Sequence, residues 1–252
     1  MGGKAGPPPA IDGVDWEALI GHLQPSAYRA FRDRLDPILG AVLLVLGLPL
    51  LAVLALAIRL DSSGPVLFRQ RRGGLYARPF TIVKFRTMRV GAPPFSAKVD
   101  ADDVMITRVG RLLRASGLDE LPQLWNVVRG EMNLIGPRPE QYELLASYEP
   151  WQHERHLVKP GVTGWWQVNH RDAVPMGLNT ERDLYYVRNQ SPALDALILV
   201  RTAALPFMAA VQALRRRRRP PEPAAQGPES PRSTLVPAAR PAETSERSHS
   251  SR

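Results

Sequence analysis

The stretch Leu118–Asn126, LDELPQLWN, leads on to Ile135–Pro139, IGPRP, and it organises the interpretation of the rest of the chain. Asp119 and Glu120 stand side by side where apolar residues begin at helical spacing, and Pro122 is tolerated in a first helical turn. The sequence therefore predicts that both carboxylates lie at the start of a short buried helix. That end of a helix carries partial positive charge and free N–H groups, which keep a carboxylate ionised and can also bind a phosphate.

This acidic pair has two interpretations. An aspartate at the start of a helix usually caps it, which would leave Glu120 as a solvated neighbour of the cap Asp119. The surrounding arginines favour a phosphate site instead, because Arg111 and Arg114 precede the pair and Arg138 follows it between two prolines. The prolines restrict the backbone and orient the guanidinium of Arg138, as phosphate binding requires. An ionised carboxylate beside a phosphate can be a nucleophile or a metal ligand.

The run from Leu118 to Pro139 resembles the bacterial sugar transferase family, the monotopic phosphoglycosyl transferases, and the resemblance covers roughly Phe31 to Leu205. It implies transfer of a phosphosugar from a UDP-sugar to a polyprenol phosphate at the cytoplasmic face of the bacterial inner membrane. The expected fold is a mixed α/β fold, mainly helical. It is that of a monotopic membrane protein with a kinked re-entrant helix, a small β-hairpin and interfacial amphipathic helices.

Composition and charge set broader bounds. The chain has 252 residues, enough for one domain with extensions, and its net charge of +9 predicts an anionic partner such as nucleic acid, anionic lipid or a phosphorylated substrate. The absence of cysteine excludes disulfides and thiol catalysis and fits a cytoplasm-facing protein. His153 and His156 are three residues apart, but neither a cysteine nor a third histidine stands near them, so we expect no zinc site.

The segment Ile38–Ile58 is an unbroken apolar run of 21 residues. A straight helix of that length measures about 31 Å, so length alone favours a single-pass transmembrane anchor. Pro49 near the middle predicts a kink, and arginines flank both ends, whereas a spanning helix has an asymmetric distribution of positive charge. A bent helix that enters and leaves on one side is therefore favoured, and the resemblance implies the same re-entrant hairpin. The family typically has Ser-Pro at the kink where this chain has Leu48-Pro49, so the kink angle stays open.

Two strands are predicted ahead of the acidic pair. Val66–Phe68 reads as one strand leading into a tight loop, and Pro79–Met88 reads as the second. Lys84 and Arg86 share one face of the second strand. This pattern fits a solvated edge carrying cations or a phosphate-binding face. Beside the acidic pair the phosphate-binding role is favoured, and the resemblance implies that Lys84 lies in the active site.

Three further segments are predicted to be helical. Ile106–Arg114 is basic and amphipathic, which is typical of a helix at a membrane surface. Arg114 matches an arginine that the family uses around the nucleotide diphosphate, or it is a lipid-facing cation. Gln141–Leu157 reads as a helix with solvated Glu and Arg residues, and Asp195–Leu214 reads as an apolar-rich helix lying on the membrane.

A glycine-rich loop with two tryptophans follows at Lys159–Asn169, KPGVTGWWQVN. The tryptophans can anchor the protein at an interface, but the segment also resembles a family loop, with Trp166 and His170 as departures from it. Asp183 lies in another matching motif and is either a second acidic group near the site or a helix-face residue. The loop residues expected to contact substrate are Lys159, Thr163, Trp165, Gln167 and Asn169.

We expect four parts in the chain. These are an N-terminal extension at 1–30, partly disordered; a re-entrant hairpin at 31–60; a cytoplasmic catalytic domain with interfacial helices at 61–214; and a basic run with a disordered Pro/Ser/Ala-rich tail at 215–252. The five arginines of Arg215–Arg219 predict contact with anionic lipid, and we expect no binding of nucleic acid.

The resemblance implies a reaction in two displacements. Asp119 attacks the sugar-bearing phosphorus of the UDP-sugar, UMP leaves, and the polyprenol phosphate then takes the phosphosugar from Asp119. Glu120, together with Asp119, is expected to hold Mg²⁺, and Lys84, Arg114 and Arg138 are expected to stabilise the phosphates. This reaction would prime the synthesis of a polysaccharide or glycoconjugate. The alternatives without catalysis are a membrane-anchored interaction protein and a nucleic-acid binder.

Overall fold

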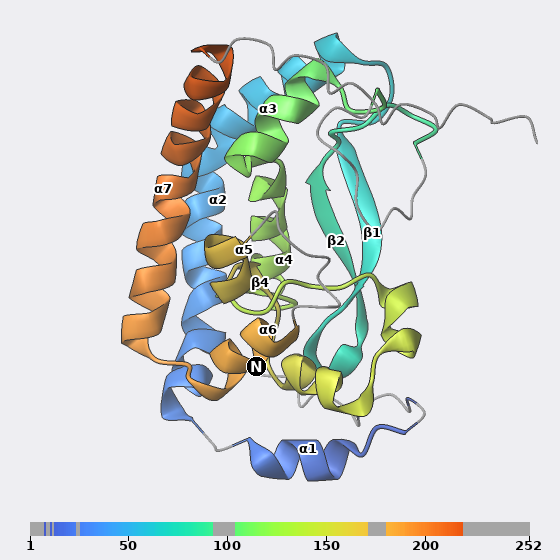
Figure 1. The fold of residues 1–252 in the computed structure, drawn as a ribbon, viewed down its shortest axis with the longest axis vertical. Helices are drawn as coiled ribbons and strands as arrows, with labels where there is room; N and C mark the ends of the chain where they lie inside the picture. The colour runs from blue at the N-terminus through green and yellow to red at the C-terminus, as the bar shows by residue number, and fades with distance from the viewer. Residues whose placement is uncertain are drawn as a thin grey trace, which may run out of the picture.

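The structure is a computed structural model, and it describes most of the chain. Within that part the protein is mainly helical, with two small two-stranded sheets (Figure 1). The expectations about the C-terminal tail, most of the N-terminal extension and the side chain of His170 lie outside the described residues. The described residues are 8, 11, 13–23, 26–92, 104–170 and 180–218, with the backbone alone at 22, at 170 and in 206–218.

Short 3₁₀-helices, labelled η, alternate with the α-helices, and the first half of the chain holds the longest helix and an antiparallel hairpin. The mainly helical fold with one hairpin and one long apolar helix near the N-terminus confirms the coarse prediction. In chain order the elements are α1 Trp16–His22, α2 Ala27–Asp61, β1 Leu67–Gly73, η1 Leu75–Ala77, β2 Pro79–Phe85, α3 Arg108–Ser116, η2 Leu118–Gln123, α4 Leu124–Val128, β3 Asn133–Ile135, η3 Tyr142–Ser147, η4 Pro150–Leu157, β4 Gly161–Thr163, α5 Trp165–His170, α6 Thr180–Arg188 and α7 Pro192–Arg218.

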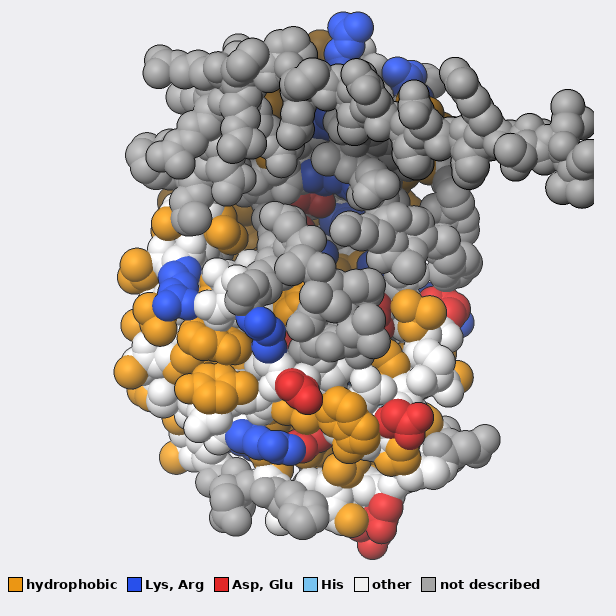
Figure 2. Space-filling model, viewed as in Figure 1, with side chains coloured by type: hydrophobic (Ala, Val, Ile, Leu, Met, Phe, Trp, Pro, Cys, Tyr) orange, Lys and Arg blue, Asp and Glu red, His pale blue; other side chains and the backbone are white. Residues whose placement is uncertain are grey.

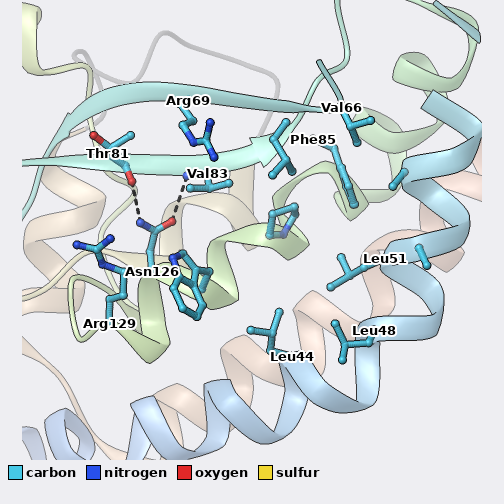
Figure 3. A pocket seen from close by; sticks show the side chains of 15 residues that line it. Leu44, Leu48, Leu51, Val66, Arg69, Thr81, Val83, Phe85, Asn126 and Arg129 are labelled. Atoms are coloured by element: carbon cyan, nitrogen blue, oxygen red, sulfur yellow. Dashed lines mark hydrogen bonds between the residues drawn. The ribbon is translucent and has the colours of Figure 1, made fainter. Parts of the chain in front are cut away.

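Helix α2 contains the apolar run as one helix of 35 residues. Among the described residues it is the one helix long and apolar enough to cross a membrane by length and composition. Pro37 as well as Pro49 lies in its interior, where each removes a backbone donor. The axis of α2 changes direction between Leu44 and Leu51 (Figure 3). These features are compatible with a monotopic protein, and the re-entrant topology stays a prediction.

The two ends of α2 pack on the rest of the molecule, whereas its middle is exposed. Near the start, Arg32 and Asp36 are each 5% exposed, and near the end Ile58 is buried with Phe85 and Leu113. Gly40 allows α4 to approach, because a Cβ there would lie 2.8 Å from Val127 Cγ1. The exposed apolar side chains between these contacts include Val42, Leu43, Val45, Leu46, Leu48, Leu50 and Val53.

A buried group of charged and phenolic side chains holds the start of α2. Arg32 donates to Tyr186 Oη at 2.7 Å and to the Ile135 carbonyl at 2.6 Å. It also forms ion pairs with Asp36 at 3.2 Å and with Asp195 of α7 at 3.0 Å. We call Arg32, Asp36, Tyr186 and Asp195 the anchor cluster, because it joins α2 to α6, α7 and β3.

The hairpin differs from its prediction at both ends. Strand β1 runs through Arg69–Gly73, which was predicted as a tight loop, because each residue there pairs with one of β2. The turn instead occupies η1, which links the two strands. Strand β2 ends at Phe85, three residues before the predicted end at Met88. Lys84 pairs with Phe68 in the observed register.

The segment that carries the acidic pair is helical, as predicted, but its first turns are a 3₁₀-helix. Gly117 adopts a φ of +76°, which only glycine adopts readily, and it lets α3 end and η2 begin at once. Asp119 and Glu120 lie in the first turn of η2, and α4 follows directly. Gly130, with a φ of +73°, lies just after α4 at the predicted stop.

The second half of the chain contains a sheet that was not predicted, in which β3 and β4 pair in parallel. Gly136 and Gly161 permit this pairing, because a Cβ on Gly161 would lie 2.0 Å from Gly136 N. The single helix predicted at 141–157 is two 3₁₀-helices, η3 and η4, separated where Pro150 starts the second. Helix α7 packs against α3 and α5.

Candidate active site

The acidic pair lies in a buried position and contacts the arginine of the IGPRP segment. Asp119 and Glu120 are 7% and 8% exposed. Arg138 Nη1 donates to Glu120 Oε1 at 2.7 Å, and the attraction of Glu120 raises the pKa of Arg138. The structure therefore brings the two predicted segments together. Figure 2 shows charged side chains of both signs gathered in a recess of the face drawn there.

Lys84 belongs to the same group of charges. Burial, together with the neighbouring Arg72 and Arg138, lowers the pKa of Lys84 to about 8 against the opposing attraction of Asp119 and Glu120. A lysine with this pKa is poised to bind an anion, because an added phosphate charge relieves the repulsion from the two arginines. We call Lys84, Arg72, Arg138, Asp119 and Glu120 the active-site cluster.

Arg72 is a member of this cluster that the sequence interpretation missed. Its guanidinium donates to the Pro139 carbonyl at 3.1 Å and to Gln70 Oε1 at 2.7 Å, and it lies 3.8 Å from Glu140 Oε1. Burial, together with the nearby charge of Arg138, lowers its pKa to about 10. Because 69–73 was predicted as a loop, no strand face was assigned to Arg72. Extending the alternation of strand β1 would have placed it on the face of Lys84.

Arg155 binds the backbone of Arg138. Arg155 is 1% exposed, donates to the Arg138 carbonyl at 2.7 Å and to Tyr148 Oη at 2.8 Å, and forms an ion pair with Asp183. The prediction that the charged residues of 141–157 are solvated is wrong for Arg155, because its guanidinium finds buried acceptors on three sides. Asp183 therefore acts as the partner of a buried arginine on a helix face.

Asn126 fixes the acidic segment relative to the strand that carries Lys84. Its Oδ1 accepts from Val83 N at 3.1 Å, and its Nδ2 donates to the Thr81 carbonyl at 2.8 Å (Figure 3). The side-chain amide thus replaces a neighbouring strand at the free edge of β2. Nδ2 also donates to Glu131 Oε2 at 2.8 Å.

Two predicted phosphate-binding arginines lie in different surroundings. Arg114 of α3 donates through Nε to Thr87 Oγ1 at 3.0 Å. Arg86 donates to the Ser62 carbonyl at 2.8 Å and to the Ser63 carbonyl, so its guanidinium secures the chain after α2. Since β2 ends before Arg86, the expected common face with Lys84 does not form.

Two residues of the predicted substrate loop make contacts with α2 and α7. Lys159 Nζ lies 3.7 Å from Asp33 Oδ1 on α2. Thr163 Oγ1 lies 2.7 Å from Thr202 Oγ1 on α7. These two contacts hold strand β4, and the residues that lead into it, between α2 and α7.

The residues of α5 pack mainly on α6 and α7. The ring of Trp165 lies 5.5 Å from that of Tyr185, and Asn169 Nδ2 donates to the Trp165 carbonyl at 2.8 Å. Arg201 of α7 contacts Asn169 and lies over Trp165. Gln167 is 5% exposed, and both polar atoms of its amide lack a hydrogen-bond partner within the described part of the chain. The contacts described for this loop join helices and do not reach the active-site cluster.

The two carboxylates beside Arg138 fit the ligand preference of Mg²⁺. The described residues contain no group of three or more His, Asp or Glu side chains that could hold a metal. Mg²⁺ in phosphate chemistry commonly binds one or two carboxylates and completes its shell with phosphates and waters. Asp119 and Glu120 can supply those carboxylates, although Arg138 already engages Oε1 of Glu120.

Comparison with known proteins identifies the family. Residues 27–209 match the family model described as bacterial sugar transferase. The chain belongs to the bacterial sugar transferase family. This confirms the resemblance found in the sequence. Bacterial sugar transferases are membrane-associated, in agreement with the apolar helix α2 of this family member.

Relatives of this sugar transferase include two that are named for transfer of a sugar phosphate to undecaprenyl phosphate and one that is named only as a sugar transferase. It is 42% identical over 194 residues to the UDP-N-acetylgalactosamine-undecaprenyl-phosphate N-acetylgalactosaminephosphotransferase of Aeromonas hydrophila, covering 74% of this chain and 46% of that protein. It is 45% identical over 174 residues to the UDP-glucose:undecaprenyl-phosphate glucose-1-phosphate transferase of Xanthomonas campestris pv. campestris, covering 65% and 36%. It is 41% identical over 170 residues to an uncharacterized sugar transferase of Bacillus subtilis (strain 168), covering 67% and 84%. The chain thus spans less than half of the first two relatives.

Proposed function

We propose that this protein transfers a sugar 1-phosphate from a UDP-sugar to undecaprenyl phosphate, releases UMP, and so primes the synthesis of a polysaccharide or glycoconjugate. The observation that carries the proposal is the buried acidic pair, with Arg138 bound to Glu120 and with Lys84 and Arg72 close by. The names of the relatives support the donor and acceptor classes. They include two different sugars, so the donor sugar is left open.

In the first step the carboxylate of Asp119 attacks the sugar-bearing phosphorus of the donor. A bond forms between a carboxylate oxygen and phosphorus, and the bond from phosphorus to the oxygen of UMP breaks. UMP leaves with the electron pair, and the phosphosugar stays on Asp119. In the second step a phosphate oxygen of undecaprenyl phosphate attacks the same phosphorus and releases the carboxylate.

The cations of the active-site cluster stabilise the charge that moves during these steps. Lys84, Arg72 and Arg138 lie near the carboxylates, so the two phosphates of the donor can balance their positive charge. Glu120 holds the guanidinium of Arg138 in place at 2.7 Å. Arg114 is proposed to reach the nucleotide from α3, and the loop residues Lys159–Asn169 are proposed to line the sugar or uridine side.

Asp119 and Glu120 are also the proposed ligands of Mg²⁺. When bound, this ion neutralises charge between neighbouring phosphates. Arg138 binds one oxygen of Glu120, and the carboxylates of Glu120 and Asp119 together are the proposed oxygen donors for the ion.

We further propose that α2 is re-entrant and that the catalytic part lies on the cytoplasmic face. The start of α2 is bound through Arg32 to the Ile135 carbonyl, and its last residue, Asp61, accepts from Val109 N at 2.8 Å. A spanning helix would place its ends on opposite sides of a hydrocarbon core about 30 Å thick. Because one catalytic domain holds both ends, the exposed middle of α2 is the part that enters the membrane.

We propose a role for each of the four parts of the chain. The boundaries 1–30, 31–60, 61–214 and 215–252 describe an extension, the membrane helix, the catalytic domain and a basic tail. Anionic lipid is the proposed partner of the basic α3 and of the arginines at the end of α7. Helix α2, Ala27–Asp61, contains the proposed membrane segment.

The test is the identity of the released nucleotide. Detergent- or nanodisc-held protein is incubated with Mg²⁺, undecaprenyl phosphate and a panel that includes UDP-glucose and UDP-N-acetylgalactosamine, and UMP is separated from UDP. The proposal expects UMP with at least one donor. UDP as product would mean ordinary glycosyl transfer and would remove the role given to Asp119. No nucleotide release from folded protein across a broad panel would favour an interaction protein without catalysis.

A further inference from the structure

An apolar pocket of about 770 Å³ lies between α2, the hairpin and the η2–α4 segment (Figure 3). Its size is within the range of about 300–1,000 Å³ that is typical of small-molecule sites. Leu48 and Leu51 of α2, Phe85 of β2, and Pro122 and Trp125 form much of its wall. The pocket lies where the axis of α2 turns, so one wall is the helix proposed to enter the membrane.

The pocket has a positively charged end. Arg69 of β1 and Arg129, which follows α4, both line it, and none of the residues that line it is acidic. Arg129 also pairs with Glu131 at 3.2 Å, but its side chain is 58% exposed, and such exposed pairs contribute little energy. An apolar cavity with two guanidinium groups at one end matches an anionic amphiphile.

The charged end faces away from the active-site cluster. Arg69 pairs with Val83, whereas Lys84 pairs with Phe68, and side chains alternate between the two faces of a strand. Arg69 and Val83 line the pocket, and Lys84 does not. A phosphate held by Arg69 and Arg129 would therefore lie across the hairpin from Lys84. The acceptor of the transfer reaction must instead bring its phosphate to Asp119.

We propose that this pocket binds an anionic membrane phospholipid, with one acyl chain against Leu48, Leu51 and Trp125 and the phosphate between Arg69 and Arg129. The lipid fills the space between the membrane helix and the strand that carries Lys84. Asn126, which holds that strand, also lines the pocket. Anionic lipid would thus support the catalytic strand from the face opposite the reaction.

The test uses the full chain in nanodiscs that contain phosphatidylglycerol or phosphatidylcholine with bromine-labelled acyl chains. The fluorescence of Trp125, obtained as the difference between the wild type and Trp125→Phe, reports contact with the acyl chain. We expect stronger quenching by brominated phosphatidylglycerol than by brominated phosphatidylcholine. The double variant Arg69→Gln/Arg129→Gln should weaken binding of phosphatidylglycerol by roughly tenfold, since each basic side chain contributes near an anionic surface.

Matched variants separate the pocket from general surface charge. Arg182→Gln/Arg188→Gln on α6 removes the same charge away from the pocket and should keep the preference for phosphatidylglycerol. Ala52→Phe places a ring in the pocket and should reduce quenching by phosphatidylglycerol. Val53→Phe changes the neighbouring residue, which is 64% exposed and does not line the pocket, and should have little effect.

Three results would overturn the lipid site. These are equal quenching by the two lipids, quenching by phosphatidylglycerol that neither pocket variant changes, and displacement of the brominated lipid by undecaprenyl phosphate at low mole fraction, which would assign the pocket to the acceptor. UMP release is measured in the same nanodiscs. Turnover without lipid-specific quenching defeats the lipid site alone, whereas lipid-specific quenching without turnover defeats the proposed reaction alone.

Discussion

Two of the buried groups of charged side chains that the structure describes differ in how their charges are compensated. In the anchor cluster, Arg32 is surrounded by Asp36, Asp195, Tyr186 and the Ile135 carbonyl, so one cation meets several acceptors. Its hydrogen-bonding capacity is used within the protein, and its effect is to hold helix α2.

The active-site cluster differs in the state of its lysine. Lys84, Arg72 and Arg138 lie near the carboxylates of Asp119 and Glu120, and Glu140 lies 3.8 Å from Arg72. Burial, together with the two arginines, still lowers the pKa of Lys84 to about 8, so this lysine is suited to an added anion such as a diphosphate. The difference teaches that burial of charge alone does not mark a catalytic site, whereas buried charge that still needs a counter-ion does. Substitutions in the two clusters should therefore have different consequences.

The largest effect is expected from Asp119→Asn. Removing a nucleophile should lower kcat by about 10⁴-fold or more, while the melting temperature stays near that of the wild type because the amide fills the same space. UMP release and thermal unfolding are measured on the same preparation. Glu181→Gln on α6 is the control, and a variant that keeps substantial UMP release would contradict the assignment.

The next effect is on stability and comes from the anchor cluster. Arg32→Met leaves two buried carboxylates without their cation, which should cost about 3–5 kcal/mol and lower the melting temperature by roughly 10 °C. Arg34→Met, at an exposed position of the same helix, should change little. The specific activity of the protein that remains folded should stay close to the wild type. An unchanged melting temperature for Arg32→Met would show that the cluster does not hold α2.

A smaller effect on catalysis is expected from Glu120→Gln. The amide keeps the shape of the side chain but removes the charge that binds Arg138, and we expect a loss of roughly 100-fold in kcat/KM. Titration with Mg²⁺ should also show a higher concentration for half-maximal rate. If Mg²⁺ dependence and rate both match the wild type, Glu120 has only a capping role.

The smallest predicted effect is a shift in the pH profile. Lys84 binds phosphate in its protonated form, so kcat/KM should fall as pH rises through about 8, where the free enzyme loses this charge. Lys84→Arg keeps a positive charge above that pH, so the falling limb should move upward even if the maximum rate is lower. If the falling limb of kcat/KM lies at the same pH in both proteins, the titration of another group causes it.

The sequence predicted the proximity of candidate-site residues that lie in local motifs better than that of residues brought together by long-range packing. Asp119, Glu120 and Arg138 could be placed together because helix-start signals and prolines restrict the chain around them. Arg72 was missed because four charged or polar residues in a row resemble a loop, and only pairing with β2 makes them a strand. Arg86 binds the Ser62 and Ser63 carbonyls after α2, and nothing local in the sequence indicates these contacts.

The fold was predicted in outline, because local sequence pattern determines some of its elements and long-range pairing determines others. The long apolar helix and the hairpin follow from local pattern, whereas the parallel pairing of β3 and β4 involves three-residue strands far apart in the chain. Arg32 was interpreted as a flanking charge of the membrane segment, because nothing local indicates that Tyr186 and Asp195 enclose it. Arg155 was expected to be solvated, since its partner Asp183 lies on a different helix.

The central claim is that Asp119 carries the phosphosugar, and peptide mapping of the trapped intermediate tests it most directly. The protein is incubated with Mg²⁺ and a UDP-sugar carrying ³²P in the sugar-bearing phosphate, without acceptor lipid, and is then digested with trypsin. We predict label on the peptide of residues 115–129, located by fragmentation at Asp119, and its loss when undecaprenyl phosphate is added before digestion. Label on any other residue, or UMP release that is complete without any acid-stable or base-labile adduct on this peptide, would contradict the account.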